Sequence, residues 1–393
     1  MCEQIISAIL RTLKSILRLG DTTMDNNKTT ITCQSSSRPY AIVIQENCFH
    51  QIVKQLSPAQ KYLIICDSNV KPLWGDKLQL AITKANISCA LISFPAGEAN
   101  KNLQTFSDLH EQIALRLDRQ STIITLGGGV TGDMGGFVAS TYMRGISFLQ
   151  IPTSLLAMVD SSVGGKLGVD TSIGKNAVGV FNNPIKVLID PSLLLTLPKN
   201  YFIDGMAEVI KHAFLSGEEY ITFLEDNVAG ILAMDLSLLS TLIIQSVQFK
   251  VMIVEQDEKE SGLRKILNYG HTIGHALEET LGYSSIPHGN AVAIGINAAN
   301  YLALKCGLLS EAAFLRIQNL LQQYHLPIFL SDLGLTGDAD QLFHFLHNDK
   351  KNQDDQVVMI LLEGLGKPII STTQTTLQIK EAINYVIKNR SLS

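Results

Sequence analysis

The sequence predicts an α/β fold in two parts, and three observations support this prediction. In the first half of the chain, short apolar runs alternate with helical patterns. A triple glycine, Gly127, Gly128 and Gly129, stands between one such run and the next helical pattern. In the second half, long helical periodicity replaces the alternation. We therefore expect a Rossmann-like parallel-sheet domain over residues 38–196 and a mainly α-helical domain over residues 197–393.

The composition agrees with two ordinary globular cores. The chain has 393 residues, of which 46% are hydrophobic and 17% are charged, and this is typical of globular domains. A net charge of −5 without a basic run gives no support for nucleic-acid binding. The six cysteines show no CxxC spacing, so neither a zinc ribbon nor a disulfide framework is indicated. A reducing cytoplasm fits this cysteine usage best.

The first 37 residues are predicted to be a dispensable extension. Residues 5–19 carry apolar side chains on one helical stripe, but the stretch is too short and too charged to span a membrane. Its positive charges lie within the apolar stretch, which is not the pattern of a signal peptide. Two alternatives remain open. The stretch could be a helix at a membrane interface, or the true translation start could be Met24, so that residues 1–23 are an artefact of upstream translation.

Short apolar runs in the first domain predict six strands, and helices are expected between several of them. The predicted strands are Tyr40–Ile44, Lys61–Cys66, Cys89–Phe94, Ser121–Leu126, Ile146–Gln150 and Lys186–Ile189. The clearest helical patterns cover Val70–Lys84 and Asn102–Leu117. Ligands of such sheets bind beyond the carboxyl ends of the strands. The turns that follow three of these strands should therefore meet at one edge of the sheet.

These turns have the composition of a nucleotide site. A strand, the triple glycine and a helix N-terminus place backbone N–H groups where phosphate oxygens can bind. Asp67 and Glu98 could accept hydrogen bonds from ribose hydroxyls, and Lys101 could contact phosphate. The alternatives are structural: a tight turn without ligand for the glycines, a helix cap for Asp67, and a solvated turn for Glu98 and Lys101.

In the second domain, periodicity predicts a series of helices, a short strand pair and a last helix. The helices are Ile210–Leu224, Ile231–Val254, His271–Leu281, Ala291–Leu304, Glu311–Tyr324 and Asp338–His347. The strand pair is Gln356–Leu362 with Pro368–Thr372, and the last helix is Gln378–Ile387.

One glutamate and three histidines of this domain are candidate metal ligands. Glu208 lies in a helical context, His271 and His275 lie four residues apart, and His288 follows in a Pro-His-Gly sequence. Two histidines and one carboxylate, with room for water or substrate, are typical of an open Zn²⁺ site. Spacing favours His271 and His275, since residues i and i+4 share a helix face. The residues alone leave open which two histidines bind metal, and polar histidines without metal remain the alternative.

A cluster of cations and carboxylates follows the triple glycine. It comprises residues 160–166, with the sequence DSSVGGK, and residues 174–176, with the sequence GKN. Because a phosphate cradle and these charges share one region, the sequence predicts chemistry on a phosphorylated, polyhydroxylated small molecule.

In their order along the chain, these segments resemble the 3-dehydroquinate synthase family, a branch of the sugar phosphate cyclases. The segments are PAGEANK, GGGVTGD, TYMRG, DSSVGGK, GKN, GMAEVIKH, DEKESGLRKILNYGHTIGHALE, PHG and DKK. The resemblance covers roughly Arg38 to the C-terminus and leaves the first three dozen residues unexplained. The chain departs from the family at three places: Asp204 stands where the family usually has Asn, Leu167 replaces a commoner Thr, and Phe181-Asn182-Asn183-Pro184 differs from the usual Phe-Tyr-Gln-Pro. The first of these matters most. Asp204 adds negative charge near Glu208, the candidate metal ligand. It also puts one expected contact in doubt, either with NAD or with a group beside the metal ion.

The resemblance implies a lyase of the shikimate pathway, which supplies aromatic amino acid biosynthesis, with NAD and Zn²⁺ or Co²⁺ as cofactors. The implied reaction converts 3-deoxy-D-arabino-heptulosonate 7-phosphate to 3-dehydroquinate and phosphate. It proceeds by transient oxidation by NAD, phosphate elimination, re-reduction and an intramolecular aldol closure. The alternatives are a sister cyclase acting on sedoheptulose 7-phosphate or glucose 6-phosphate, and a glycerol-dehydrogenase-like alcohol dehydrogenase.

The resemblance also implies roles for individual residues. The implied metal ligands are Glu208, His271 and His288, and the implied catalytic residues are Glu260, His275, Lys166 and Asn176. Implied substrate contacts are Arg144, Asp160, Lys166, Asn176, Lys211, Lys250, Arg264, Asn268, His275 and one lysine of the pair Lys350 and Lys351. Implied NAD contacts are Asp67, Ser68, Asn69, Glu98, Lys101, Gly127, Gly128, Gly129, Asp133, Thr153, Ser154, Lys175, Leu193 and Thr196. Arg144 would reach the neighbouring subunit, so a homodimer is implied; no membrane or nucleic-acid partner is expected.

Overall fold

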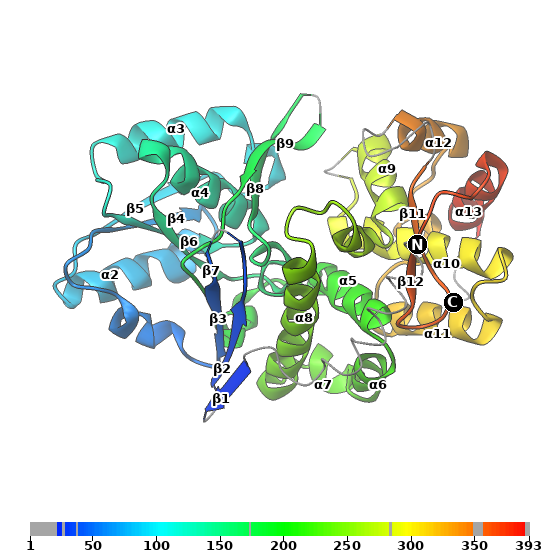
Figure 1. Cartoon of the computed structure of the whole chain (residues 1–393), viewed down its shortest axis with the longest axis horizontal. Coiled ribbons are helices and arrows are strands. Elements are labelled where there is room, and N and C mark those ends of the chain that lie inside the picture. The colour runs from blue at the N-terminus through cyan, green and yellow to red at the C-terminus, as the bar shows by residue number, and fades with distance from the viewer. Residues whose placement is uncertain are drawn as a thin grey trace. The chain divides into compact units, whose positions relative to one another are not determined.

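The chain folds into two compact units (Figure 1). The structure is a computed structural model that describes residues 22–25, 28–36, 38–172, 174–282, 285–348 and 357–389. The sheet unit contains the described residues of Leu19–Pro198 together with Leu236–Lys259. The helical unit contains Lys199–Asp235 and the described residues from Glu260 onward. The predicted amphipathic stretch over residues 5–19 and the predicted contact Lys350 lie outside the described residues.

The sheet unit is built on eight strands in the order β1-β2-β3-β10-β7-β6-β4-β5. Their bounds are β1 Thr22–Asp25, β2 Lys28–Cys33, β3 Tyr40–Gln45, β4 Tyr62–Asp67, β5 Cys89–Phe94, β6 Thr122–Gly127, β7 Ser147–Pro152 and β10 Lys186–Ile189. The strands from β3 to β5 in this order pair in parallel, whereas β1 and β2 pair antiparallel. The six predicted strands are therefore present, and the predicted α/β fold class is confirmed.

Strand β2 was not predicted, and it corrects the expected extent of the N-terminal extension. It pairs with β3 along its whole length, from Lys28 opposite Gln45 to Cys33 opposite Tyr40. Alternate side chains of β2 are buried, and Cys33 is fully so. Residues 28–33 therefore belong to the sheet and not to an extension outside it. The signal in the sequence was a run rich in β-branched residues, KTTITC, in which Ile31 and Cys33 stand two positions apart. Such a run is typical of a strand.

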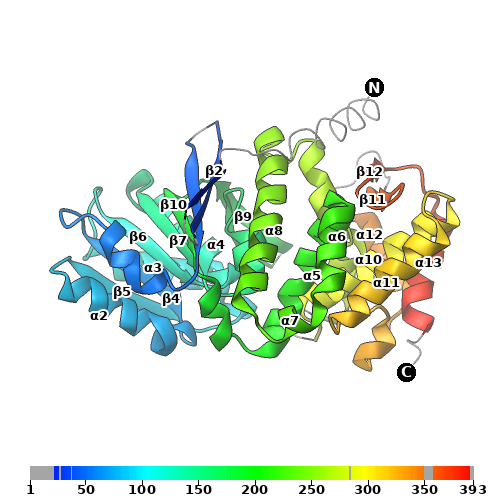
Figure 2. The same cartoon turned by 90° about the horizontal axis from the view of Figure 1, so that it is seen from below.

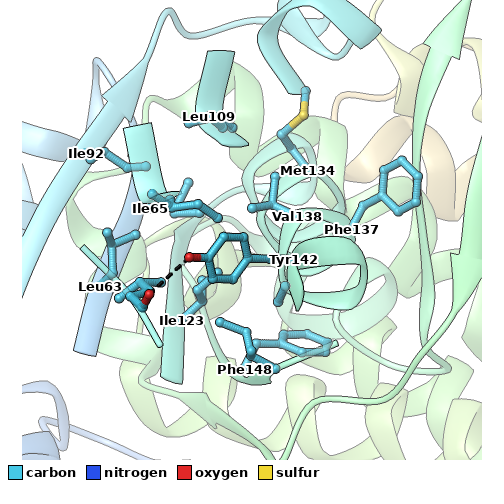
Figure 3. Close-up of a cluster of buried hydrophobic side chains, with 14 of the residues drawn as sticks. Leu63, Ile65, Ile92, Leu109, Ile123, Met134, Phe137, Val138, Tyr142 and Phe148 are labelled. Carbon is cyan, nitrogen blue, oxygen red and sulfur yellow. Dashed lines mark hydrogen bonds between the residues drawn. The ribbon is translucent and has the colours of Figure 1, made fainter. Parts of the chain in front are cut away.

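Four α-helices and several short 3₁₀ or π segments complete the sheet unit. The helices are α2 Asp76–Lys84, α3 Leu103–Ala114, α4 Gly129–Thr141 and α8 Leu236–Gln256. The short segments are η1 Phe49–Gln55, η2 Lys71–Gly75, η3 Glu98–Asn100, η4 Tyr142–Arg144, η5 Ala157–Ser161 and η6 Pro191–Thr196. A buried cluster from β4, β6, α3 and α4 forms the core on one face of the sheet (Figure 3). In it the Tyr142 hydroxyl donates a hydrogen bond to the Leu117 carbonyl at 3.0 Å.

The cation-rich segment forms an antiparallel hairpin that was not predicted as strands. Its strands are β8 Lys166–Thr171 and β9 Gly174–Phe181. Leu167 and Val169 of β8 are buried in the core cluster, whereas β9 is largely exposed. Leu167 and Val169 thus anchor the hairpin, and the polar residues on either side of them, Lys166 and Asp170, are exposed and half-buried respectively.

Helix α8 has the length and hydropathy of a membrane-spanning helix. It is nonetheless rich in buried side chains, among them Leu242, Ile243 and Val247. It also buries Lys250, whose partner lies in the same unit. This is the pattern of a core helix. Residues 236–259 were expected in the second domain, but they belong to the sheet unit.

The helical unit contains most of the predicted helices. Its elements are α5 Lys199–Ser216, α6 Glu218–Asp226, α7 Val228–Leu232, η7 Leu263–Asn268, α9 His271–Leu281, α10 His288–Lys305, α11 Glu311–Gln323, η8 Leu330–Leu333, α12 Ala339–Asn348, β11 Met359–Leu362, β12 Pro368–Ser371 and α13 Thr376–Lys388. Helix α10 packs against α5, α9, α11 and α13 and is the central helix of the unit (Figure 2). The helix predicted over Ile210–Leu224 is interrupted at Gly217, whose φ of 120° favours glycine.

Candidate active site

The glycine turn of the sheet unit joins β6 directly to α4. A Cβ atom on Gly127 would lie 2.5 Å from Oγ1 of Thr131, and one on Gly129 would lie 3.2 Å from Oγ of Ser161. Glycine therefore allows the backbone to approach these hydroxyls closely. The first N–H groups of a helix have no partner within the helix, and its positive end favours anions. The turn fits the phosphate groups of a nucleotide.

Asp67, at the end of β4, holds the neighbouring turn together. Its Oδ1 accepts hydrogen bonds from the N–H groups of Asn69 and Val70, at 2.9 and 3.0 Å. Its Oδ2 accepts one from the Thr131 hydroxyl of α4 at 3.2 Å. Ser68 Oγ accepts from the Ala96 N–H at 3.0 Å and so links this turn to the one after β5. Asp67 therefore caps the local turn, and its contact with NAD stays a prediction.

Lys101 is buried at 5% exposure and is engaged by protein groups. Its Nζ lies 2.6 Å from Asp133 Oδ2 on α4 and 2.6 Å from Asn176 Oδ1 on β9. Burial lowers the pKa of Lys101, but Asp133 and Glu98 outweigh burial and raise it, so the ammonium group stays charged. Two predicted NAD contacts and one predicted substrate contact therefore share one network. Beside it, Lys175 Nζ lies 3.7 Å from Glu98 Oε1.

The turns after β7 and β10 complete the same edge of the sheet. The Thr153 N–H donates to the Gly127 carbonyl at 2.9 Å, so Thr153 and Ser154 adjoin the glycine turn. Thr196 Oγ1 accepts from the indole N–H of Trp74 at 3.0 Å. Sequence reasoning missed buried Asp190, whose carboxylate accepts hydrogen bonds from the backbone of three residues, Asn47, Phe49 and Ser192. Its signal was an Asp-Pro pair at the end of a strand, which is typical of a capped helical turn.

Asp160 and Lys250, both predicted substrate contacts, form a close ion pair in the sheet unit. Lys250 Nζ lies 2.6 Å from both the carboxylate and the backbone carbonyl of Asp160. Lys250 is only 5% exposed, so the pair is partly desolvated. The pair therefore ties α8 to the turn η5, and Asp160 is not merely a helix cap.

Arg144 lies on the surface of the sheet unit in a left-handed backbone conformation, with φ 70°. It lines a pocket of about 530 Å³ together with Arg38 and Arg119. Among the described residues that line this pocket, none is acidic. The pocket is therefore strongly cationic. The remaining predicted substrate contact of this unit, Lys166, is exposed at the start of β8.

In the helical unit, Glu208 of α5 meets the first residues of α9 and α10. Glu208 Oε1 lies 3.3 Å from His271 Nε2 and 3.5 Å from His288 Nε2. One ligand atom from each of the three residues lies within 4.8 Å of the others. A buried carboxylate that faces two imidazole nitrogens fits an open divalent metal site. A second set of the same size is His275, Glu278 and His288.

The electrostatics of this cluster put Glu208 and His271 in the forms that bind a metal ion, whereas His288 is protonated. Burial raises the pKa of Glu208, but Lys211 and His271 outweigh burial and hold it well below its usual range. Lys211, 1% exposed, contacts the second oxygen of this carboxylate. Burial together with the charge of Lys211 lowers the pKa of His271, so this imidazole is neutral at neutral pH. An anionic carboxylate and a neutral imidazole are the forms that bind metal. Burial lowers the pKa of His288, but the hydrogen bonds to Glu208 and Glu278 outweigh burial and raise it to about 10. A metal ion that binds at His288 must therefore displace a proton.

Both histidines that face Glu208 are held through their other ring nitrogen. His271 Nδ1 lies 3.2 Å from the Tyr269 carbonyl, and His288 Nδ1 lies 3.3 Å from Glu278 Oε1. His275 is farther from a partner, since its Nε2 lies 4.0 Å from Glu278 Oε2. The geometry therefore groups His271 and His288 with Glu208, against the spacing argument for His271 with His275.

Comparison with known proteins identifies the family. Residues 91–204 match the family described as 3-dehydroquinate synthase N-terminal, and residues 205–352 match 3-dehydroquinate synthase C-terminal. The 3-dehydroquinate synthase of Rippkaea orientalis is 43% identical over 350 residues, which cover 88% of this chain and 95% of that protein. The chain belongs to the 3-dehydroquinate synthase family. The enzyme of that name from Streptococcus pneumoniae is 41% identical over 357 residues, covering 89% of this chain and 97% of its own.

Solved structures of other sugar phosphate cyclases share the fold of this 3-dehydroquinate synthase family member. A 2-deoxy-scyllo-inosose synthase, complexed with carbaglucose-6-phosphate, NAD⁺ and Co²⁺, has a TM-score of 0.83 at 29% identity and covers 91% of this chain and 100% of its own. A 2-epi-5-epi-valiolone synthase from Streptomyces hygroscopicus, with NAD⁺ and Zn²⁺ bound, has a TM-score of 0.82 at 25% identity and covers 94% of this chain and 99% of its own.

The remaining residues expected from the 3-dehydroquinate synthase family lie on or beside η7. Arg264 is 2% exposed. The Asn268 side chain donates a hydrogen bond to Glu260 Oε1 at 2.6 Å. Glu260 has a left-handed backbone conformation, with φ 60°, which costs a non-glycine residue on the order of 1 kcal/mol. A buried guanidinium and a held carboxylate therefore occur in the same unit as the metal cluster.

Asp204, where the 3-dehydroquinate synthase family usually has Asn, caps the start of α10. Its Oδ1 accepts a hydrogen bond from the Gly289 N–H at 2.6 Å. A Cβ atom on Gly289 would overlap the Asp204 carbonyl oxygen, so only glycine allows this approach. Burial raises the pKa of Asp204. The departure therefore keeps an oxygen acceptor next to His288, because either Asp or Asn can accept this hydrogen bond.

Proposed function

We propose that this chain is a 3-dehydroquinate synthase: it converts 3-deoxy-D-arabino-heptulosonate 7-phosphate to 3-dehydroquinate and phosphate. The observation that carries the proposal is the cluster of Glu208, His271 and His288 in a unit that also buries two cations, Lys211 and Arg264. A metal site in the same unit as buried cations suits a substrate with a carboxylate at one end, a phosphate at the other and hydroxyls between them.

Two cofactors support this activity. We assign NAD to the carboxyl edge of the sheet, on Gly127, Gly128 and Gly129, and a divalent metal ion to Glu208 and its two histidines. The residues present fit both groups: the glycine turn presents helix N–H groups to an anion, and the cluster offers one carboxylate and two imidazole nitrogens. When bound, NAD accepts and returns a hydride, and the metal ion polarises hydroxyl oxygens of the substrate.

We assign the cations of the chain to different groups of the substrate and of the metal cluster. Arg264 offers a planar fork that matches a carboxylate, so we assign the substrate carboxylate to it. Lys211 is engaged by Glu208, so its charge holds the carboxylate of the metal cluster in the anionic form. Lys166 is exposed, and we assign the compact charge of its ammonium group to the substrate phosphate.

His275 and Glu260 are the groups we assign to proton transfer. The His275 side chain is 36% exposed, so it can exchange protons with solvent. An imidazole changes its protonation near neutral pH and can act as acid or base there. Glu260 accepts a hydrogen bond from Asn268, which fixes the position of its carboxylate. Together the two side chains can take up a hydroxyl proton and later return it.

We further propose a homodimer in the cytoplasm. Arg144 and the cationic pocket lie on the surface of the sheet unit, where the guanidinium can meet the phosphate of a substrate bound by a second copy. Burial raises the pKa of the Cys48 and Cys66 thiols to about 12, which suits cysteines kept reduced. The small-molecule substrate is a sugar phosphate, as for the family.

Substrate choice tests the proposal against a sister cyclase. Phosphate release is measured from 3-deoxy-D-arabino-heptulosonate 7-phosphate and from sedoheptulose 7-phosphate, which lacks the carboxylate. We expect turnover of the first substrate only. Arg264→Met should lower kcat/KM by roughly 10²-fold or more, because the carboxylate loses a charge-assisted partner. If the protein converts sedoheptulose 7-phosphate and not the first substrate, it is a sister cyclase and the proposal is wrong.

A further inference from the structure

We infer that Glu278 is a positioning residue that sets the orientation of the His288 ring in the metal cluster. The inference rests on the metal site of the proposed function. Glu278 lies on α9, seven residues after His271 and three after His275, so it shares a helix face with both. None of the roles implied by the family resemblance falls on it.

The Glu278 carboxylate is almost fully buried, at 2% exposure. A buried carboxylate is costly unless it has partners. Its Oε1 lies 3.3 Å from His288 Nδ1, and its Oε2 lies 4.0 Å from His275 Nε2. The first contact is within hydrogen-bonding distance and the second is not. The main partner of Glu278 among these histidines is therefore His288.

This contact decides which nitrogen of His288 is available to a metal. With the hydrogen on Nδ1 donated to Glu278, Nε2 is the nitrogen from which a metal ion would displace a proton, and Nε2 is 3.5 Å from Glu208 Oε1. A carboxylate behind a metal-binding imidazole fixes its tautomer and makes it a stronger ligand. His271 obtains the same orientation from a different acceptor, the Tyr269 carbonyl. Loss of Glu278 should therefore affect one of the two histidines.

The backbone of His288 is held separately from its ring. Asp204 accepts a hydrogen bond from the N–H of the next residue, Gly289, and fixes the start of α10. Once the backbone is fixed, rotation about the side-chain bonds is the freedom that remains to His288. Glu278 removes that freedom by holding Nδ1.

Substitution of Glu278 therefore should weaken metal binding without removing a ligand. Glu278→Gln keeps the volume and the oxygen acceptor but loses the charge, whereas Glu278→Leu loses the acceptor as well. We expect zinc affinity to fall by roughly 10-fold for Gln and by roughly 100-fold for Leu. Glu279→Gln is the matched control, because Glu279 is the next residue on α9 and is exposed. Its affinity should equal that of the wild type.

The test measures zinc dissociation constants of the full chain by competition with a chromophoric chelator, together with the visible absorption spectrum after loading with Co²⁺. The inference predicts weaker binding and an altered Co²⁺ spectrum for both Glu278 variants. Wild-type affinity and spectrum in Glu278→Gln would overturn it, even if Glu278→Leu fails to fold. Weaker stability of the metal-free variant with unchanged zinc affinity would likewise overturn it, since the role would then be structural. If the wild type binds no metal, the proposed function fails; if the wild type and Glu278→Gln bind equally, this inference alone fails.

Discussion

At the scale of single residues, three buried lysines show how the predicted cations are used. Lys101, Lys211 and Lys250 each contact a carboxylate of their own unit. The sequence indicated that these lysines mattered, but their type and spacing are equally compatible with a phosphate contact. Which anion they meet depends on tertiary packing between segments far apart in the chain. In this structure the three lysines therefore position neighbouring carboxylates and balance their charge.

The two histidines of α9 should behave differently when each is replaced. His271→Ala should lose metal and activity together, because His271 Nε2 faces Glu208. His275→Ala should retain the metal and lose activity by about 10² to 10⁴, the usual effect of removing an acid–base group. Metal content of the purified variants by atomic absorption, with activity on the same samples, checks this. Equal loss of metal in both variants would contradict the assigned roles.

The Asp160–Lys250 pair should show a coupling energy. We expect the cycle of Asp160→Asn, Lys250→Met and the double variant to give about 1–3 kcal/mol, because the groups are in contact and partly desolvated. Urea unfolding of the four proteins measures it. The more exposed pair of Lys61 and Asp118 is the control, and its coupling should be clearly smaller, because solvent screens both charges. Equal couplings for the two pairs would show that burial does not strengthen the first.

At the scale of elements, the segment that follows β2 is held by the turn that follows α8. Glu258 accepts hydrogen bonds from Ser35, Ser36 and Asn183. Glu258→Gln should lower the free energy of unfolding by about 1 kcal/mol, because a charge-assisted acceptor is lost. Glu111→Gln, on the exposed face of α3, is the control and should change little. Urea unfolding at pH 7 measures both, and equal effects would contradict a role for this contact.

The same contact should depend on pH. The hydroxyls of Ser35 and Ser36 hold the pKa of Glu258 at about 2, below its usual value of 4.5. A carboxyl whose pKa is lowered by folding stabilises the protein above the unfolded pKa, and this contribution is lost as pH falls through the folded pKa. The stability difference between wild type and Glu258→Gln should therefore be constant from pH 7 to about 5 and shrink between about pH 4 and 2. A difference that grows in this range would contradict the assignment.

Periodicity predicted the elements whose side chains face a core. The six parallel strands and α9 were predicted, because their apolar residues recur at the spacing that burial requires. The hairpin β8–β9 escaped prediction, because its exposed strand carries little apolar pattern. The site residue Glu278 escaped for another reason. A glutamate at the end of a helical histidine motif looks like an exposed residue, but in the structure Glu278 is buried and faces His288 of α10.

At the scale of the whole molecule, the division into two units is discontinuous. Residues 236–259 lie with the sheet although they follow helices of the other unit. Their apolar pattern predicts a buried helix but not the unit against which the helix packs. The sequence therefore could not predict that these residues belong to the sheet unit. The same limit applies to oligomeric state, since an exposed Arg144 serves equally in its own subunit or in a neighbour.

Mixing inactive variants should reveal whether Arg144 acts across a dimer. Arg144→Ala and His271→Ala are each expected to be inactive. If Arg144 serves the neighbouring subunit, a mixed dimer has one complete site, and random exchange should restore about a quarter of wild-type activity. The mixture is assayed after subunit exchange, with each variant alone as control. No recovery, despite exchange confirmed by native mass spectrometry, would show that Arg144 serves its own subunit.

The most direct test of the account is the number of substrate molecules converted per NAD. The purified, metal-loaded chain is given excess 3-deoxy-D-arabino-heptulosonate 7-phosphate and sub-stoichiometric NAD, and phosphate release and absorbance at the NADH band are recorded together. A cyclase that returns each hydride should release many phosphates per NAD without accumulating NADH, and chelation should abolish this. NADH formed in proportion to substrate consumed would contradict the account and identify a dehydrogenase.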